Sequence, residues 1–314
     1  MTASRVAAVD CGTNTIKLLV ADLDAGSGEE RELVRTSRMV RLGQDVDRDR
    51  RLAADALERV LAAVDEYAEV VSRHDVPASA VRFCCTSAVR DASNATVFLD
   101  GVEHRLGVRP EVVSGAEEAA LSYAGATRVA TDLVPPVLVV DIGGGSTELV
   151  LGDGLEPGAA HSLDIGSVRL TERYLASDPP TADEVEAARS EIERQLDTLP
   201  GHGVDLTSAQ TVVAVSGTGL TVAAAVLDLP ALQREGLDGA SVPVDGVIAS
   251  AGDLLAMTVE QRRALPYMHP GRADVIGGGA LVIASVLGRA GVDRLRVSVR
   301  DILDGIAWSV LERP

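Results

Sequence analysis

Two stretches of the chain repeat one pattern, an aspartate followed by a turn rich in glycine and hydroxyl groups. The first stretch runs from Val9 to Val20 and the second from Val140 to Leu151. Glycine lets the backbone turn tightly and bring its N–H groups close to a ligand. Successive N–H groups in such a turn form a concave site for anions, and serine or threonine hydroxyls add donors. Each stretch therefore predicts a phosphate-binding loop.

The aspartate that opens each loop, Asp10 or Asp141, is suited to hold a cation that screens phosphate charge, because hard cations prefer carboxylate oxygens. One copy alone is equally well explained as an ordinary hairpin turn, but two copies in the same register favour binding. The chain has neither the P-loop motif nor the dinucleotide-binding glycine motif, which argues against both of those sites. The predicted phosphate contacts are Thr13, Asn14 and Thr15 in the first loop and Gly143, Gly144, Gly145 and Ser146 in the second.

Apolar runs flank each loop, so each copy reads as a β-hairpin, the first over Arg5–Leu23. Downstream, strands and helices alternate in both halves of the chain, which is typical of an α/β protein. The further predicted strands are 33–42, 81–86, 111–114, 211–215 and 295–299. The predicted helices are 52–71, one from about residue 87 through 106, 114–127, 168–175, 183–199, an alanine-rich helix after 219, and 302–311.

A chain of 314 residues suggests about two domains. The boundary between the halves falls near Pro135-Pro136, and we assign an N-terminal domain to residues 1–130 and a C-terminal domain to residues 131–314. We expect the last helix, at about 302–314, to pack back on the first domain.

Composition limits the possible partners. Hydrophobic residues make up 46% of the chain but aromatic residues only 2%, so the core is aliphatic and stacking platforms for single-stranded nucleic acid are not expected. A net charge of −18 argues against a general polyanion-binding surface, although a local pocket with a metal can still bind phosphate. No apolar run is long enough for a membrane span and no signal peptide is recognisable. The three cysteines, Cys11, Cys84 and Cys85, do not suggest a disulfide framework, so we predict reduced thiols and a cytoplasmic location.

Six motifs, taken in order, resemble those of the Ppx/GppA family of exopolyphosphatases and guanosine pentaphosphate phosphohydrolases. They are Val9–Thr15, Thr86–Asn94, Ser114–Ala119, Asp141–Glu148, Gly166–Glu172 and Gly271–Ile276. The resemblance covers nearly the whole chain. It implies the actin-like, ribonuclease H-like fold, with two similar α/β domains around a central cleft, in the short two-domain form. A fold alone does not give a function.

Glu117 and Glu118 compete for the role of general base. Glu117 stands three residues after Ser114, which is the spacing of a capping box and indicates a structural role. Glu118 matches the family's catalytic glutamate, so the resemblance implies that it activates the attacking water. The alternative for Glu118 is a solvated glutamate in the first turn of a helix.

The resemblance also implies that Asp141 and Glu148 bind Mg²⁺ or orient the water, and Asp10 is the counterpart of Asp141 in the first half. The alternative for Glu148 is an exposed charge on a hairpin. In the first copy, Lys17 occupies the position that corresponds to Glu148. The simplest interpretation of Lys17 is a lysine on the surface of a strand. The family places an arginine against phosphate where Arg90 stands. The alternative is a surface Arg90 paired with its neighbour Asp91.

These features predict an exopolyphosphatase, a Mg²⁺-dependent hydrolase that releases orthophosphate from the end of inorganic polyphosphate and favours short chains. Conversion of guanosine pentaphosphate to the tetraphosphate is a close alternative, since both reactions cut a terminal phosphoanhydride. Two other readings remain open: a sugar kinase or ATPase, and a weakly active regulator that binds guanosine polyphosphates or polyphosphate. We expect neither nucleic acid nor membrane as a partner, and the resemblance suggests a homodimer.

Overall fold

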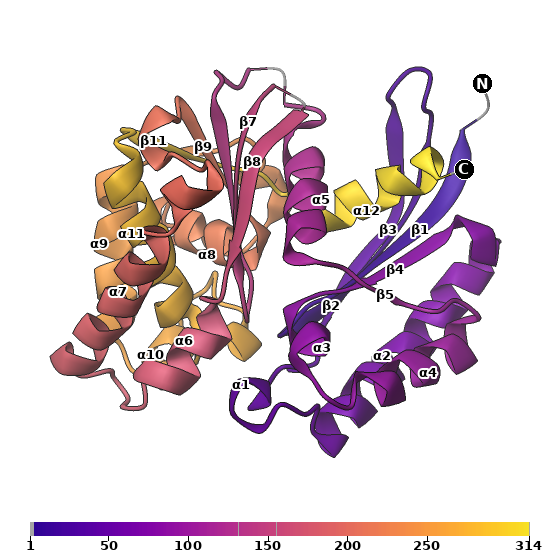
Figure 1. Cartoon of the computed structure of the whole chain (residues 1–314), viewed down its shortest axis with the longest axis horizontal. Helices are drawn as coiled ribbons and strands as arrows, with labels where there is room; N and C mark the ends of the chain where they lie inside the picture. The colour runs from indigo at the N-terminus through magenta and orange to yellow at the C-terminus, as the bar shows by residue number, and fades with distance from the viewer. Residues whose placement is uncertain (1–2, 131, 155, 314) are drawn as a thin grey trace. The chain divides into compact units, whose positions relative to one another are not determined.

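The computed structural model describes residues 3–130, 132–154 and 156–313 (Figure 1). The chain divides into two compact units. Unit 1 comprises residues 1–121 together with 302–314, and unit 2 comprises residues 122–301. The division therefore falls inside a helix, nine residues before the predicted boundary, and the C-terminal segment belongs to unit 1. Thr131, the first residue of the predicted second domain, lies outside the described residues.

Unit 1 is built on a five-stranded sheet with the order β3-β2-β1-β4-β5. The first three strands form an antiparallel meander, and β4 and β5 run parallel to β1. The strands are β1 (Ser4–Cys11), β2 (Thr15–Leu23), β3 (Glu30–Met39), β4 (Val81–Cys85) and β5 (Glu111–Val112). The helices are α1 (Val46–Asp49), α2 (Ala54–Arg73), α3 (Ser87–Asp91), α4 (Ala95–Leu106), α5 (Gly115–Thr127), which ends in unit 2, and α12 (Ile302–Ser309).

Both faces of this sheet are buried, because successive side chains of a strand point to opposite faces. Along β1, Ala7 and Val9 join the core that includes α2 and α4, whereas Val6 and Ala8 join a second core with Ile306 and other apolar residues of α12. The C-terminal helix therefore covers one face of the N-terminal sheet (Figure 1).

Unit 2 repeats the same topology. Its sheet has the order β10-β11-β9-β6-β7-β8, in which β6, β7 and β8 form the antiparallel meander and β9 and β11 run parallel to β6. The strands are β6 (Val137–Ile142), β7 (Thr147–Asp153), β8 (Glu156–Leu163), β9 (Thr211–Val215), β10 (Ser241–Pro243) and β11 (Arg294–Val297). The helices are α6 (Ser167–Tyr174), α7 (Ala182–Leu196), α8 (Ser216–Val226), α9 (Val244–Ala256), α10 (Val259–Arg263) and α11 (Ile276–Ala290). This duplication confirms the predicted fold class.

The helix predictions need correction in two respects. The single helix expected up to Leu106 is interrupted between α3 and α4, where the side-chain amide of Asn94 exchanges hydrogen bonds of 2.8 and 3.0 Å with the backbone of Leu52. Helices α1, α9, α10 and α11 were not predicted. The first turn of α9, Val244–Val247, follows Pro243 without a strong capping residue. None of the described helices is both long and apolar enough to cross a membrane.

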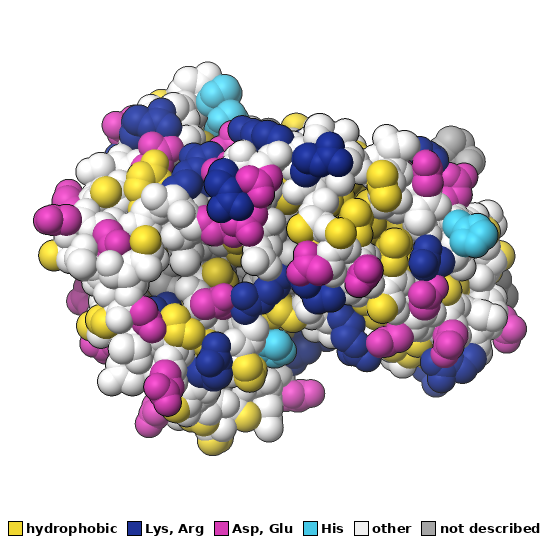
Figure 2. Space-filling model, turned by 90° about the horizontal axis from the view of Figure 1, so that it is seen from below, with side chains coloured by type: hydrophobic (Ala, Val, Ile, Leu, Met, Phe, Trp, Pro, Cys, Tyr) yellow, Lys and Arg dark blue, Asp and Glu magenta, His cyan; other side chains and the backbone are white. Residues whose placement is uncertain are grey.

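Charged side chains of both signs are mixed on the surface. On the face drawn in Figure 2, lysine and arginine side chains are interspersed with aspartate and glutamate. This face carries no continuous basic stripe of the kind that tracks a nucleic-acid backbone.

Candidate active site

The two predicted phosphate loops have the same closing hydrogen bond. In unit 1, Gly12 donates its N–H to the carbonyl of Thr15 at 3.0 Å, and in unit 2, Gly143 donates to the carbonyl of Ser146 at 3.0 Å. Each bond closes the turn between the first two strands of its sheet. The two copies of the sequence pattern are therefore two copies of one local structure.

The first loop is supported from behind by the segment that follows β3. Gly43 donates its N–H to the carbonyl of Thr13 at 2.7 Å, and Val40 and Arg41 both donate to the carbonyl of Asn14 at 3.0 Å. The carbonyl and the N–H of one trans peptide point in opposite directions. The N–H of Asn14 therefore points away from this support, and within the described chain it donates no hydrogen bond.

The second loop is supported in the same way by the start of α6. Ser167 and Val168 donate their N–H groups to the carbonyls of Gly143 and Gly144 at 2.9 and 2.8 Å. The side chain of Arg169 donates through Nε to the carbonyl of Gly145 at 2.7 Å. With these carbonyls turned toward α6, the N–H groups of Gly144 and Gly145 face the other way and are available to an anion.

Close packing at this support requires a glycine. A Cβ added to Gly166 would lie 2.5 Å from the carbonyl oxygen of Gly144 and 2.7 Å from the N–H nitrogen of Gly145. Such distances are far inside van der Waals contact. Gly166 therefore lets α6 approach the loop closely enough to fix its peptide planes.

The two hairpins differ at one position that decides their charge. In unit 1, Asp10 pairs across the strands with Lys17, and the Lys17 Nζ atom lies 3.1 Å from the Asp10 Oδ2 atom. In unit 2, the equivalent cross-strand pair is Asp141 with Glu148. The first hairpin therefore supplies its own cation to its aspartate, and the second sets two carboxylates side by side.

Hydroxyl groups hold both carboxylates of the second hairpin. Ser122 and Ser216 donate to the two oxygens of Asp141, at 2.5 and 2.6 Å, and Ser162 donates to Glu148 at 2.7 Å. The carboxylates are buried, with relative exposures of 5% for Asp141 and 1% for Glu148. Glu148 is therefore not an exposed hairpin charge.

This donor set fits Mg²⁺, although no metal is part of the structure. Mg²⁺ is usually held by one or two carboxylates and completes its shell with water and substrate phosphates. Among the described residues no group of three or more His, Cys, Asp or Glu side chains forms a closed metal site. Asp141 and Glu148 match the open arrangement. Asp10 fits less well, because Lys17 already lies against it.

The two adjacent glutamates of α5 have different partners. Glu117 lies 2.5 Å from the buried Arg82, and its N–H donates to the Ser114 hydroxyl at 3.2 Å. Glu118 is buried, with 7% exposure, and accepts a hydrogen bond of 3.1 Å from Arg90. Arg90 also donates to the carbonyl of Val113 at 2.9 Å. The Glu117 N–H makes one of the two bonds of the expected capping box, while its carboxylate pairs with Arg82. Glu118 is not a solvated helix-turn residue.

The structure thus groups the predicted residues in two sets. Unit 1 holds the first loop with Asp10, and Glu118 with Arg90, whereas unit 2 holds the second loop with Asp141 and Glu148. Sequence reasoning missed the serines that hold the acids. Ser122 and Ser162 lie in an ordinary helix and strand, and nothing local marks them.

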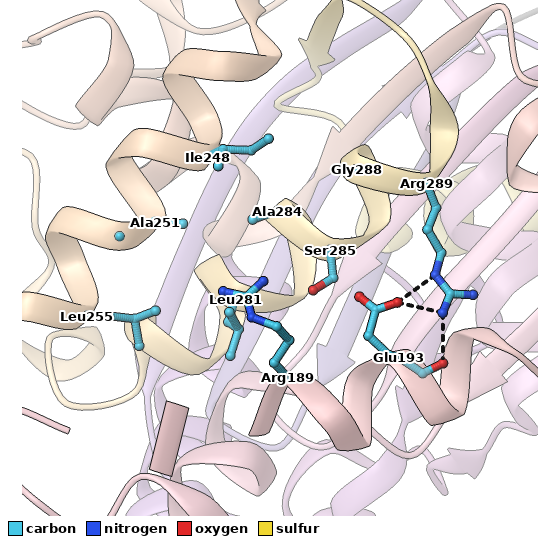
Figure 3. A pocket seen from close by; sticks show the side chains of 11 residues that line it. Arg189, Glu193, Ile248, Ala251, Leu255, Leu281, Ala284, Ser285, Gly288 and Arg289 are labelled. Atoms are coloured by element: carbon cyan, nitrogen blue, oxygen red, sulfur yellow. Dashed lines mark hydrogen bonds and ion pairs between the residues drawn. The ribbon is translucent and has the colours of Figure 1, made fainter. Parts of the chain in front are cut away.

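A cavity of about 550 Å³ lies elsewhere in unit 2, among α7, α9 and α11 (Figure 3). Its wall is mostly aliphatic, and its Glu193 carboxylate already pairs with Arg289. None of the predicted site residues lines it. The cavity is therefore separate from the candidate active site.

Comparison with known proteins settles the family. Residues 19–313 match the model of the Ppx/GppA phosphatase family. The chain belongs to this family. The motif Asp141–Glu148 contains the second loop with its two acids, and the motif Ser114–Ala119 contains Glu118.

Individual Ppx/GppA relatives match over most of the chain. Exopolyphosphatase 2 of Mycobacterium tuberculosis is 45% identical over 321 aligned residues, which cover 99% of each protein. The crystal structure of an exopolyphosphatase-like protein superposes with a TM-score of 0.94 at 41% identity, over 98% of each chain. A guanosine-5'-triphosphate,3'-diphosphate pyrophosphatase of Photobacterium profundum is 34% identical over 68% of this chain and 41% of its own length.

Proposed function

We propose that this member of the Ppx/GppA family is an exopolyphosphatase, which hydrolyses the terminal phosphoanhydride of inorganic polyphosphate and releases orthophosphate. The observation that carries the proposal is the buried Asp141–Glu148 pair beside a glycine loop whose N–H groups are free to bind an anion. The full-length similarity to an exopolyphosphatase supports the choice of substrate.

Hydrolysis of a phosphoanhydride needs an oriented water, a base and neutralisation of the phosphate charge. We assign phosphate binding to the loop N–H groups, those of Gly144 and Gly145 in unit 2 and of Asn14 in unit 1. Asp141 and Glu148 would hold Mg²⁺, which supplies positive charge at the phosphates when it is bound. Their burial and their hydroxyl partners keep them in place for this role.

Glu118 is the proposed general base. The adjacent Arg90 donates a hydrogen bond of 3.1 Å to its carboxylate and helps to hold it in place. A buried carboxylate can accept a proton from water. Glu117 is less suited to this role, because its side chain is 45% exposed and paired with Arg82. The same Arg90 remains the residue that we propose to contact phosphate.

Conversion of guanosine pentaphosphate to the tetraphosphate is the second candidate. The similarity to the Photobacterium pyrophosphatase favours it, and the same loops and acids serve a terminal phosphoanhydride on a nucleotide. We expect polyphosphate to be the better substrate, with a preference for short chains.

The test is orthophosphate release in the presence of Mg²⁺ from short polyphosphate, long polyphosphate and guanosine pentaphosphate, each assayed separately. Glu118→Gln should lower the rate about 10²–10⁴-fold, the usual contribution of a general base. Glu117→Gln is the matched control on the neighbouring position and should retain most of the activity.

Each result has a clear meaning. A higher rate on guanosine pentaphosphate than on polyphosphate would favour the second candidate. Release that is equal in wild type and Glu118→Gln would remove Glu118 from the mechanism. If no substrate releases phosphate but guanosine polyphosphates bind, the protein is a regulator and not an enzyme.

A further inference from the structure

Three serines converge on the acid pair of unit 2 from three different elements. Ser122 comes from α5, Ser162 from β8 and Ser216 from the start of α8. Ser122 is fully buried in the helix. Elements far apart in the sequence have therefore been brought together at two carboxylates.

The geometry at Ser216 indicates that its contact is not incidental. Ser216 has a φ of +62°, which is a left-handed backbone conformation. This conformation is unfavourable for residues other than glycine. Glycine follows directly at position 217, yet the strained position carries a serine. The Ser216 hydroxyl donates a hydrogen bond of 2.6 Å to Asp141, which glycine could not make.

The two hydroxyls on Asp141 occupy different oxygens of the carboxylate, Ser122 on Oδ2 and Ser216 on Oδ1. Hydrogen-bond donors on both oxygens fix the rotation of the Asp141 carboxylate about its Cβ–Cγ bond. Hydroxyl donors do this without adding a positive charge beside a prospective cation.

We propose that Ser122, Ser162 and Ser216 are positioning residues that orient Asp141 and Glu148 to bind a divalent cation. This inference rests on the proposed function, in which that acid pair holds Mg²⁺. Hydrogen-bond partners commonly orient the side chains that bind a metal. Their removal lowers metal affinity or activity about 10–100-fold.

The experiment measures Mn²⁺ binding to the full-length protein without substrate, from the electron paramagnetic resonance signal of free Mn²⁺. Ser122→Ala and Ser216→Ala should each raise the dissociation constant about 10-fold or more. In phosphate-release assays they should raise the Mg²⁺ concentration needed for half-maximal rate more than they lower the rate at saturating Mg²⁺.

Ser216→Gly separates positioning from folding. Glycine accepts the left-handed conformation without strain, which offsets the loss of the hydrogen bond to Asp141, so this variant should unfold close to the wild-type temperature. It lacks the hydroxyl, so its Mn²⁺ affinity should still fall. A purely structural role for Ser216 predicts instead that affinity is preserved together with stability.

Ser285→Ala is the matched control for loss of a buried hydroxyl in the same unit. The Ser285 Oγ atom is buried and finds no hydrogen-bond partner in the described part of the chain. This variant should bind Mn²⁺ like the wild type. Equal weakening in Ser285→Ala and Ser122→Ala would overturn the proposal, as would unchanged binding in both Ser122→Ala and Ser216→Gly.

Asp141→Asn distinguishes failure of this inference from failure of the proposed function. If Asp141→Asn abolishes Mn²⁺ binding while the serine variants leave it unchanged, the positioning role is wrong and the metal assignment stands. If Asp141→Asn binds Mn²⁺ as tightly as the wild type, the metal assignment is wrong and the positioning role falls with it.

Discussion

At the residue scale, the two copies of the hairpin differ in charge at one cross-strand position. Lys17 and Glu148 face Asp10 and Asp141 in the same cross-strand register, and they carry opposite charges. Directly opposite residues of an antiparallel pair have their Cβ atoms about 5 Å apart, so their charges interact strongly. The first copy therefore contains its own ion pair, whereas the second places two carboxylates opposite each other.

Replacing Lys17 with methionine tests this view of the first hairpin. Asp10 is only 4% exposed and would lose a partner, so we expect the free energy of unfolding to fall by about 1–3 kcal/mol. Urea denaturation measures the loss. The double variant Asp10→Asn/Lys17→Met should lose less than the sum of the two single variants, and strict additivity would show that the two side chains do not interact.

A second residue-scale prediction concerns pH. The rings of His161 and His202 are stacked with their centroids 3.6 Å apart. Burial, and then the neighbouring His202, lowers the pKa of His161 below its usual value of 6.5. The unfolded chain therefore binds more protons below about pH 6.5, so stability should fall as the pH drops through and below this value.

The melting temperature at pH 7.5 and pH 5.5 measures this effect. The decrease on acidification should be smaller in His161→Gln than in the wild type. His104→Gln, at an exposed position of α4, is the control and should keep the wild-type decrease. An unchanged decrease in His161→Gln would rule out His161 as its source.

At the scale of elements, each predicted phosphate loop is shaped by the segment packed behind it. The 40–43 segment and the first turn of α6 donate hydrogen bonds to loop carbonyls and thereby turn the loop N–H groups outward. The loop sequence alone would leave these peptide planes free to rotate. The outward orientation of the loop N–H groups thus comes from the neighbouring segments.

Gly166→Ala should disturb this arrangement in unit 2. The added methyl group has no space against Gly144, so we expect a loss of about 1–3 kcal/mol in stability and about 10²-fold in phosphate release. Gly252→Ala in α9 is the control, since a Cβ there meets nothing within 4 Å. It should be neutral or stabilise by up to about 1 kcal/mol, and equal losses in both variants would contradict the prediction.

At the scale of the whole molecule, unit 1 is discontinuous in sequence. The chain leaves it after Leu121 and returns at Ile302, and α12 then covers one face of the N-terminal sheet. Arg35 of β3 pairs with the buried Asp304, which also connects the returning helix to the sheet. Unit 1 therefore cannot be completed until the C-terminal segment is present.

Ile306→Ala measures this dependence. Ile306 is fully buried in the core between α12 and the sheet, so truncation should cost about 2–5 kcal/mol in urea denaturation. Ile248→Ala, at a position that is 44% exposed, should cost far less. A fragment of residues 1–121 should not fold alone, and a stable, cooperative fragment would contradict the requirement for α12.

The sequence by itself determined the class of the fold, the two hairpins and the identity of the acids. These follow from local patterns, since alternating apolar residues specify strands and the repeated Asp–Gly pattern specifies a turn. The motifs also indicated the family, which the comparisons confirm. The catalytic and metal-binding roles of Glu118, Asp141 and Glu148 remain predictions.

Only the tertiary structure decided the partners of those acids. Lys17 at Asp10, Arg90 at Glu118 and the serines at Asp141 and Glu148 are contacts that depend on how elements pack. The donors Ser122 and Ser216 lie 19 and 75 residues from Asp141, so no local spacing reveals them. Residue types and periodicity set what each element is, but long-range packing sets which side chains meet.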